Sequence, residues 1–213
     1  MKAKCLIIAG LISLLFLCPF SSCAADPIQL PSPQMEGGKP LMQALKDRKT
    51  TRTFSEEKLP AQTLANLLWA AFGINRPDGR RTAPSAKNWQ EIDIYVATAD
   101  GFFLWDPREN TLNSILTKDS RALAGTQAYV KDAAANLVYV ADYSKVDGGG
   151  YDKDVLVGAD TGFISQNVYL YCASEGLATV VRAGIDRDML AKELKLRPEQ
   201  KIILAQSVGY AKK

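Results

Sequence analysis

The first 25 residues differ so sharply from the rest of the chain that they set the size of the domain that can fold. Two lysines lie within the first five residues, residues 5–20 are almost entirely apolar, and residues 21–25 are small. A basic start, an apolar stretch and a small-residue exit are the three parts of a secretory signal. Removing these 25 residues from 213 leaves 188, enough for one domain with its own core.

Two other interpretations of this segment stay open. The first is a membrane anchor, but about 16 apolar residues fall short of the roughly 20 that cross a bilayer. The second is a lipoprotein acylated at Cys23, although Phe20 stands where a small aliphatic residue is expected. We expect a signal peptide at 1–25, an exported, periplasmic protein, and no membrane span after cleavage.

The remaining residues predict an extended tether followed by one α+β domain. Residues 26–40 contain four of the ten prolines and a pair of glycines, which favours an extended tether. In the domain at 41–213, apolar periodicity predicts helices at 41–48, 61–72, 120–135, 160–175 and 186–194, and strands at 92–98, 101–107, 136–142, 178–181 and 202–210. This order is typical of a sheet with helices packed on it. The last long helix offers Phe163, among others, for burial.

Composition excludes several classes of chemistry. The chain has no histidine, which excludes a Ser-His-Asp triad and a His-ligated zinc or haem iron. Its formal charge of +3 falls to +1 without Lys2 and Lys4, so nucleic acid is not an expected partner. Cys172, the only cysteine outside the first 25 residues, lies in an apolar helical stretch and predicts a buried, unreactive thiol.

Three short segments carry residues suited to binding a ligand. Arg48, Lys49, Thr50 and Arg52 follow a predicted helix, and this mixture of cations and hydroxyls suits a phosphate. The alternative is a solvated helix end, where cations complement the helix dipole. For the other two segments, the residues taken alone are likewise weak evidence for a bound ligand.

The second segment is 83–90, and its amides and backbone could contact the edge of a heterocycle. Its proline, serine and asparagine equally predict an ordinary turn. The third segment, 176–186, forms a short strand that ends at Gly184, where a ligand could approach the backbone closely. By itself it is an ordinary helix–strand–helix connection.

Taken together, these segments resemble the nitroreductase family of FMN-dependent oxidoreductases. The resemblance extends from about Leu41 to Tyr210. It rests on Arg48, Thr50 and Arg52, on Pro84, Ser85, Asn88 and Gln90 some 30 residues later, on Gly176-Leu177 after the long helix, on Gly184-Ile185-Asp186, and on the closing Ser207–Tyr210. It implies a nitroreductase-like α+β fold with a central, mainly antiparallel sheet flanked by helices, in an intertwined homodimer.

The resemblance also implies a cofactor and a role for each matching residue. Arg48 and Thr50 would bind the FMN phosphate, and Lys49 between them is a further cofactor-binding residue. Arg52 would approach the pyrimidine edge of the flavin, where a cation stabilises the reduced form. Ala183 and Gly184 would lie beside the flavin N5. The other subunit would contribute Pro84, Ser85 and Asn88 to the ring and ribityl chain, and Gln90 of the same motif is a further cofactor-binding residue.

The chain departs from the family pattern at several positions. After the closing strand, Lys212 and Lys213 are the only cations; Ala183 replaces a common acidic residue, and Glu91 replaces a common tryptophan. The short chain resembles the compact branch related to SagB-type azoline dehydrogenases.

Three hypotheses follow from the sequence. The first is an exported FMN oxidoreductase that passes electrons from NAD(P)H, a quinol or a redox protein to a nitroaromatic or quinone-like acceptor, with the flavin and not a side chain as the catalytic group. The second is an FMN- or small-molecule-binding module without turnover. The third is a structural exported domain that has lost FMN.

Overall fold

The computed structural model describes residues 26–148 and 151–212. The predicted signal peptide at 1–25, with Cys23, lies outside the described residues, as does Lys213. Residues 143–151, which contain three consecutive glycines, predict a mobile loop, and two of these glycines, residues 149–150, lie outside the described residues too.

Seven strands form one sheet in which every neighbouring pair is antiparallel. The spatial order is β1-β4-β3-β2-β5-β7-β6. The strands are β1 (Ile28–Gln29), β2 (Ile92–Thr98), β3 (Gly101–Asp106), β4 (Thr111–Leu116), β5 (Ala135–Asp142), β6 (Ala178–Arg182) and β7 (Gln200–Gly209). The predicted hairpin at 91–107 is β2 and β3, and the antiparallel α+β architecture is confirmed.

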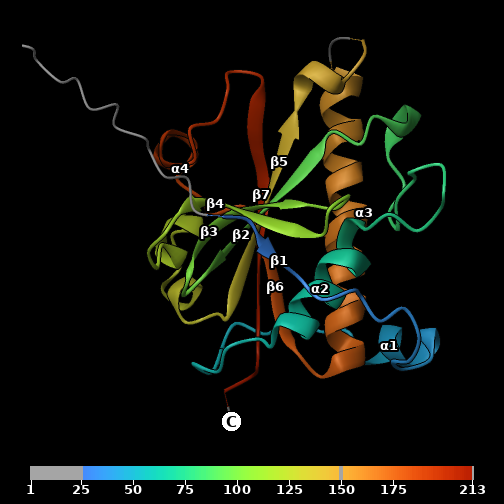
Figure 1. Cartoon of the computed structure of the whole chain (residues 1–213), viewed down its shortest axis with the longest axis vertical. Coiled ribbons are helices and arrows are strands. Elements are labelled where there is room, and N and C mark those ends of the chain that lie inside the picture. Colours follow the sequence, from blue (N-terminus) through green and yellow to red (C-terminus); the bar gives the residue numbers. More distant parts are fainter. Residues whose placement is uncertain (1–25, 149–150, 213) are drawn as a thin grey trace, which may run out of the picture.

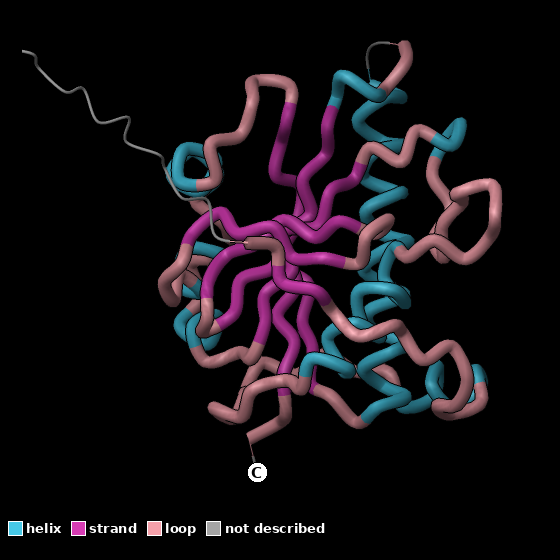
Figure 2. The backbone as a smooth tube through the Cα atoms, in the orientation of Figure 1, coloured by secondary structure: helices cyan, strands magenta, loops and turns pink. Residues whose placement is uncertain are grey.

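Helices cover both faces of this sheet. They are α1 (Leu41–Asp47), α2 (Ala61–Phe72), α3 (Tyr151–Glu175) and α4 (Arg187–Glu193), with short 3₁₀ turns η1 (Ala86–Asn88), η2 (Arg121–Ala124), η3 (Ala128–Lys131) and η4 (Tyr143–Lys145). Figure 1 shows α1, α2 and α3 on one side of the strands and α4 on the other, and Figure 2 shows the strands fanning between them. Among the described residues, no helix combines the length and hydropathy needed to cross a bilayer.

The core lies on both faces of the central strands. One cluster joins α2 and α3 to the sheet and includes Leu67, Phe72 and Ile164, while a second joins α4, η2 and η3 to the other face. β5 is buried along its whole length because helices cover both of its faces. Cys172 belongs to the first cluster with no exposed surface, and this burial raises the pKa of its thiol, which confirms the predicted buried thiol.

The helix predicted at 120–135 is wrong. The structure has η2 and η3 there instead, and strand β5 already begins at Ala135. Gly125 separates the two turns in an extended conformation, and the N–H of Thr126 donates to the carbonyl of Gly184 at 3.0 Å rather than to a preceding helical turn. A contact 58 residues away in sequence thus overrides the local helical pattern. Strand β4 carries too weak an apolar pattern for the sequence to have indicated it.

Helix α3 begins at Tyr151, nine residues before the predicted start at Asp160. Phe163, predicted to be available for burial, is 48% exposed, and Val155 and Leu156 are exposed as well. With Ala159 these side chains fall within a stripe of roughly 100° on the helix, since each residue advances the helix by a fixed angle. The stripe faces away from the sheet, which is why the core does not cover it.

The segment predicted as an extended tether is extended, but it is attached to the domain. Ile28 and Gln29 pair with Leu112 and Thr111 of β4, and Leu30 is 4% exposed within the first core cluster. The side-chain amide of Asn110 donates to the carbonyl of Pro31 at 2.8 Å. Local sequence could not indicate this docking because the partner residues lie about 80 positions away.

We expect Leu30→Ala to lower the free energy of unfolding by about 2–4 kcal/mol, because it empties a buried site in the core. Ile28→Ala, in the same strand segment but 47% exposed, is the matched control and should cost less than about 1 kcal/mol. Urea unfolding of both variants measures the difference. Equal costs would show that residues 26–40 form a free tether in solution.

Candidate functional site

The segment Arg48–Arg52 leaves α1 and runs beside the edge strand β6. The Arg48 N–H still donates to the Ala44 carbonyl at 2.9 Å, but the backbone of Arg48 turns out of the helix with φ −56° and ψ 120°. The Thr51 N–H then donates to the carbonyl of Thr179 on β6 at 2.9 Å. One backbone bond therefore fixes the middle of the segment against the sheet.

Tyr169 of α3 contacts two of the predicted phosphate-binding residues. The guanidinium carbon of Arg48 lies 5.4 Å from the centroid of the Tyr169 ring, and the Thr50 hydroxyl lies 3.1 Å from the Tyr169 hydroxyl. The N–H of Val181 on β6 also donates to that hydroxyl, at 3.0 Å. The structure thus brings Arg48 and Thr50 together on one side chain, which the sequence analysis did not single out.

The other cations of the segment lie nearby. Lys49 lines a cavity of about 440 Å³ between α1 and the end of α3, together with Lys39, Asp47 and Thr51. Arg52 is exposed. The ion pairs of the described residues include none with Arg48, Lys49 or Arg52, so these cations have no internal counter-ion there. The N–H of Lys212 donates to the Thr53 carbonyl at 3.3 Å, which places this cation beside the same segment.

Gly184 lies just beyond the other end of β6. Its carbonyl accepts from the N–H of Thr126 at 3.0 Å, and a side chain at this position would meet the amide of Gln127. Within the described part of the chain the Gly184 N–H donates to no protein acceptor. A close-packed glycine with a free N–H is a backbone donor that a flat ligand can approach. Ala183 beside it is exposed.

Beneath this turn lies Arg182, a buried arginine that the sequence analysis did not assign. One terminal nitrogen, Nη2, donates to the Ala124 carbonyl at 2.9 Å and to Asn136 Oδ1 at 3.1 Å, while Nε and Nη1 have no partner among the described residues. Burial lowers the pKa of Arg182 to about 10. An arginine that ends an otherwise apolar strand is the sequence signal that could have indicated it.

The second predicted segment, 83–90, forms a turn in which several polar groups bond to each other. Ser85 Oγ accepts from the Gln90 N–H at 3.1 Å, and the Gln90 amide donates to Asn88 Oδ1 at 3.1 Å. Lys87, Asn88 and Gln90 have positive φ values of 49°, 58° and 48°, a left-handed conformation that costs non-glycine residues free energy. Pro84 and Asn88 are exposed, so Ser85 and Gln90 shape the turn that presents them.

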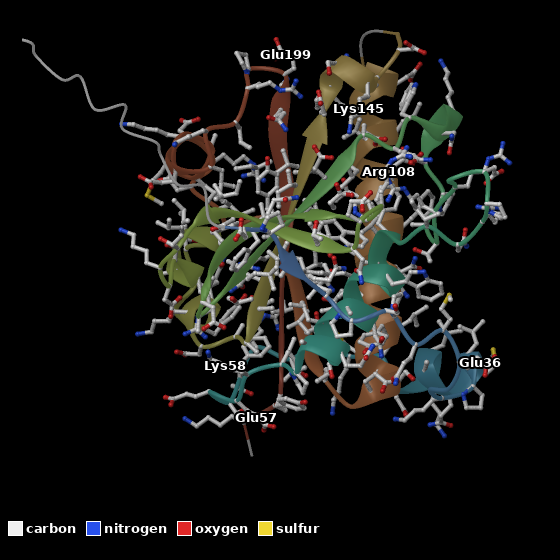
Figure 3. The ribbon with its side chains drawn as sticks, in the orientation of Figure 1. Glu36, Glu57, Lys58, Arg108, Lys145 and Glu199 are labelled. Carbon is white, nitrogen blue, oxygen red and sulfur yellow. The ribbon has the colours of Figure 1, made fainter. Side chains whose placement is uncertain are left out.

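A pair of buried carboxyl groups supports this turn. Asp160 of α3 accepts from the Ala86 N–H at 2.8 Å, and Glu91 is fully buried with no hydrogen-bond partner among the described residues for either oxygen. Burial, then the negative charge of Asp160, raises the pKa of Glu91 to about 7, while Lys145 on η4 opposes this shift. Figure 3 shows Lys145 near the upper end of the sheet. The pair therefore holds a proton at mildly acidic pH.

One subunit does not bring all predicted residues together. The Ser85–Gln90 turn is attached to α3 at Asp160, whereas Thr50 is attached at Tyr169. Nine residues separate these anchor points, or about 13 Å along a helix that rises 1.5 Å per residue. In Figure 1 the loop around η1 lies at the upper right, while the segment after α1 crosses the lower part of the view. The predicted residues of one subunit thus fall into two separate groups, named here the first half-site, around Arg48 and Thr50, and the second half-site, around Ser85 and Gln90.

Comparison with known proteins identifies the family to which this chain belongs. Residues 45–210 match the model of the Nitroreductase family. The chain is 27% identical over 183 residues to a provisionally named nitroreductase of Methanocaldococcus jannaschii, covering 81% of this chain and 92% of that protein. A crystal structure of a provisionally named nitroreductase from Ralstonia eutropha JMP134 has a TM-score of 0.82 and 39% identity, with coverage of 88% and 90%.

A second similar structure is the NADPH:FMN oxidoreductase of Vibrio harveyi complexed with NAD⁺. It has a TM-score of 0.62 and 20% identity, with coverage of 81% of this chain and 69% of that one, so it bears on the fold alone. The fold and the family match define the class as flavin-dependent oxidoreductases. The chain belongs to the nitroreductase family.

We expect the stability of the protein to fall as pH rises from about 4.5 to 7. The ordinary pKa of a glutamate is 4.5 and that of folded Glu91 is about 7, so the folded state holds a proton that the unfolded chain has lost. The raised pKa therefore stabilises the fold at low pH by roughly 3 kcal/mol relative to pH above 7. Urea unfolding between pH 4.5 and 8 measures the slope.

Glu91→Gln mimics the protonated carboxyl and should reduce that slope. Glu57→Gln, an exposed glutamate labelled in Figure 3, should leave it intact. A slope that persists in Glu91→Gln would assign the proton uptake to another group.

Proposed function

We propose that the protein is an exported, FMN-dependent oxidoreductase of nitroreductase type. It transfers electrons from a small-molecule or protein donor to a small organic acceptor such as a nitroaromatic or a quinone. This proposal rests on the observation that Arg48, Thr50 and Gly184 all lie beside strand β6 or just beyond its end. Val181 of β6 and Thr50 both hydrogen-bond to the Tyr169 hydroxyl. Val181 is three residues before Gly184, or about 10 Å away in an extended strand.

The first half-site fits the phosphate end of FMN. Arg48 supplies a planar set of donors without an internal counter-ion, Thr50 adds a hydroxyl, and Lys49 and Arg52 add positive charge to the same segment. Arginine and hydroxyl donors together form strong, charge-assisted hydrogen bonds to a phosphate. The backbone bond from Thr51 to β6 holds these donors in place before a ligand arrives.

The far end of β6 fits the flavin ring. The free N–H of Gly184 supplies a donor for N5, and the exposed backbone at Ala183 leaves room for the ring face. Arg52 is the cation that would lie near the pyrimidine edge. Bound FMN would supply the electron transfer itself, and the side chains here bind and orient it.

The second half-site supplies the partner's contribution in a homodimer. Asp160 and Tyr169, the α3 residues that contact the two groups, are about 13 Å apart along the helix. Pro84, Ser85, Asn88 and Gln90 would therefore complete the site of another subunit. The exposed apolar side chains of α1 and α3 support an interface there: Leu41, Met42, Leu45, Val155, Leu156 and Phe163. Exposed apolar surface of this extent on two helices is typical of a protein–protein contact.

The electron donor depends on the compartment. The Vibrio harveyi protein of the same fold is named for NADPH and FMN, and membership of the nitroreductase family supports NAD(P)H as the donor to test first in vitro. The predicted signal peptide supports export to the periplasm, where a quinol or a redox protein is the class of donor that we propose. The compact chain supports a place near the SagB-type branch, but no described segment of this domain points to the peptide reaction of that branch.

An absorbance spectrum during anaerobic titration tests the proposed function. A bound flavin that NADH, NADPH or a quinol bleaches supports the oxidoreductase. A flavin bleached by dithionite alone supports the binding module without turnover, and a protein without affinity for FMN supports the structural domain.

We expect Arg48→Ala to weaken FMN binding by about tenfold to a hundredfold, since it removes hydrogen bonds from a charged donor to a charged phosphate. Arg108→Ala, at an exposed arginine labelled in Figure 3, controls for the loss of one positive charge. Titration of the flavin-free protein with FMN, followed by flavin fluorescence, gives both constants. Equal affinities would remove Arg48 from the phosphate site.

We expect Phe163→Glu to convert a dimer into monomers, because it introduces a charge into the apolar stripe of α3. The monomers should also lose FMN, since each would keep two incomplete half-sites. Light scattering after size-exclusion chromatography measures the mass, and absorbance measures flavin per subunit. Met189→Glu, at a 41% exposed residue of α4 on the other face of the sheet, should leave both unchanged.

A further inference from the structure

We propose that Tyr169 is a positioning residue that selects for the phosphate of the flavin. Its ring holds the Arg48 guanidinium, and its hydroxyl directs the hydroxyl proton of Thr50 outward, toward a phosphate oxygen. This inference rests on the proposed function and names a residue that no part of the sequence pattern indicated. It predicts that the protein binds FMN more tightly than riboflavin. The difference comes from phosphate contacts of Arg48 and Thr50, which Tyr169 holds in position without touching the phosphate itself.

The Tyr169 hydroxyl is held in one place by the fold. Tyr169 is 8% exposed, and its helix, α3, packs against the sheet. The ring therefore has little freedom to change its rotamer. The N–H of Val181 on β6 donates to the hydroxyl at 3.0 Å. Because that N–H belongs to the sheet backbone, the hydroxyl oxygen is fixed relative to β6 and to Gly184 beyond it.

The direction of the hydrogen bonds follows from the donor count. A tyrosine hydroxyl has one proton and accepts through its oxygen. The oxygen already accepts from Val181, and among the described residues the Thr50 Oγ1 atom at 3.1 Å is the one remaining hydrogen-bond partner of this hydroxyl. We therefore assign the Tyr169 proton to Thr50, because the proton would otherwise have no acceptor in the protein. Thr50 then acts as the acceptor in this contact, and its own proton is left for a different acceptor. An anionic oxygen is the acceptor that binds such a proton most strongly.

The ring orders the arginine at the same point. A guanidinium 5.4 Å from a ring centroid lies within the range of a cation–π contact. Arginine side chains lose considerable rotamer entropy when they bind, and a stacked arginine has lost part of it beforehand. One side chain thus prepares two ligands of the phosphate, a cation and a hydroxyl donor.

Four variants of the flavin-free protein, titrated with FMN and with riboflavin, test this inference. Riboflavin lacks the phosphate, so it reports on the rest of the site. We expect Tyr169→Phe to weaken FMN binding by about tenfold and to leave riboflavin affinity unchanged. Thr50→Val should have the same effect, and the double variant Tyr169→Phe with Thr50→Val should lose no more than either single variant. Thr50→Ser keeps a hydroxyl and should retain the affinity for FMN.

The outcomes separate this inference from the function on which it rests. Equal losses of FMN and riboflavin in Tyr169→Phe would make Tyr169 a packing residue and overturn the inference, as would unchanged FMN affinity or strictly additive losses. If the unaltered protein binds neither flavin, or both equally, the phosphate assignment itself fails. Should Tyr169→Phe prove unfolded by circular dichroism, the contrast between Thr50→Val and Thr50→Ser still decides whether the Thr50 proton matters.

Discussion

The packing of α3 against the sheet is the constraint on which both half-sites depend. Val157, Ile164, Val168 and Cys172 are fully buried and recur at helical spacing along one face of the helix. From this anchored helix, Asp160 bonds to the Ala86 N–H and Tyr169 contacts Arg48 and Thr50. Because a packed helix is a rigid rod, the two half-sites keep a fixed separation. Assembly with a second subunit is the way in which they can meet in our proposal.

Buried polar groups lie beneath the backbone turns of each half-site. Asp160 and Glu91 lie under the Ser85–Gln90 turn, and Arg182 with Asn136 lies under the turns around Gly125 and Gly184. Such groups cost free energy when their partners are incomplete, and Glu91 and Arg182 both keep unpaired atoms. These groups also restrict the loops to one conformation, since a buried hydrogen bond fixes a loop more firmly than apolar contacts do.

The sequence predicted most of the regular elements because their patterns are local. Helix α2 has apolar residues at helical spacing and ends at Gly73, and the β2–β3 hairpin alternates on either side of a tight turn. The false helix at 120–135 and the missed strand β4 share one cause. In both, a partner distant in sequence decides the backbone: Gly184 for Thr126, and β3 and β1 for β4.

The sequence by itself excluded chemistry that needs histidine. It also determined the order of most elements and the three segments of the proposed flavin site. Those features depend on residue type and spacing along the chain. The tertiary structure alone decided that Tyr169 joins Arg48 to Thr50, that Glu91 and Asp160 share a buried space, and that the Ser85–Gln90 turn and Thr50 contact different positions on α3. These are contacts between residues far apart in sequence, and only the packing of α3 on the sheet brings them together.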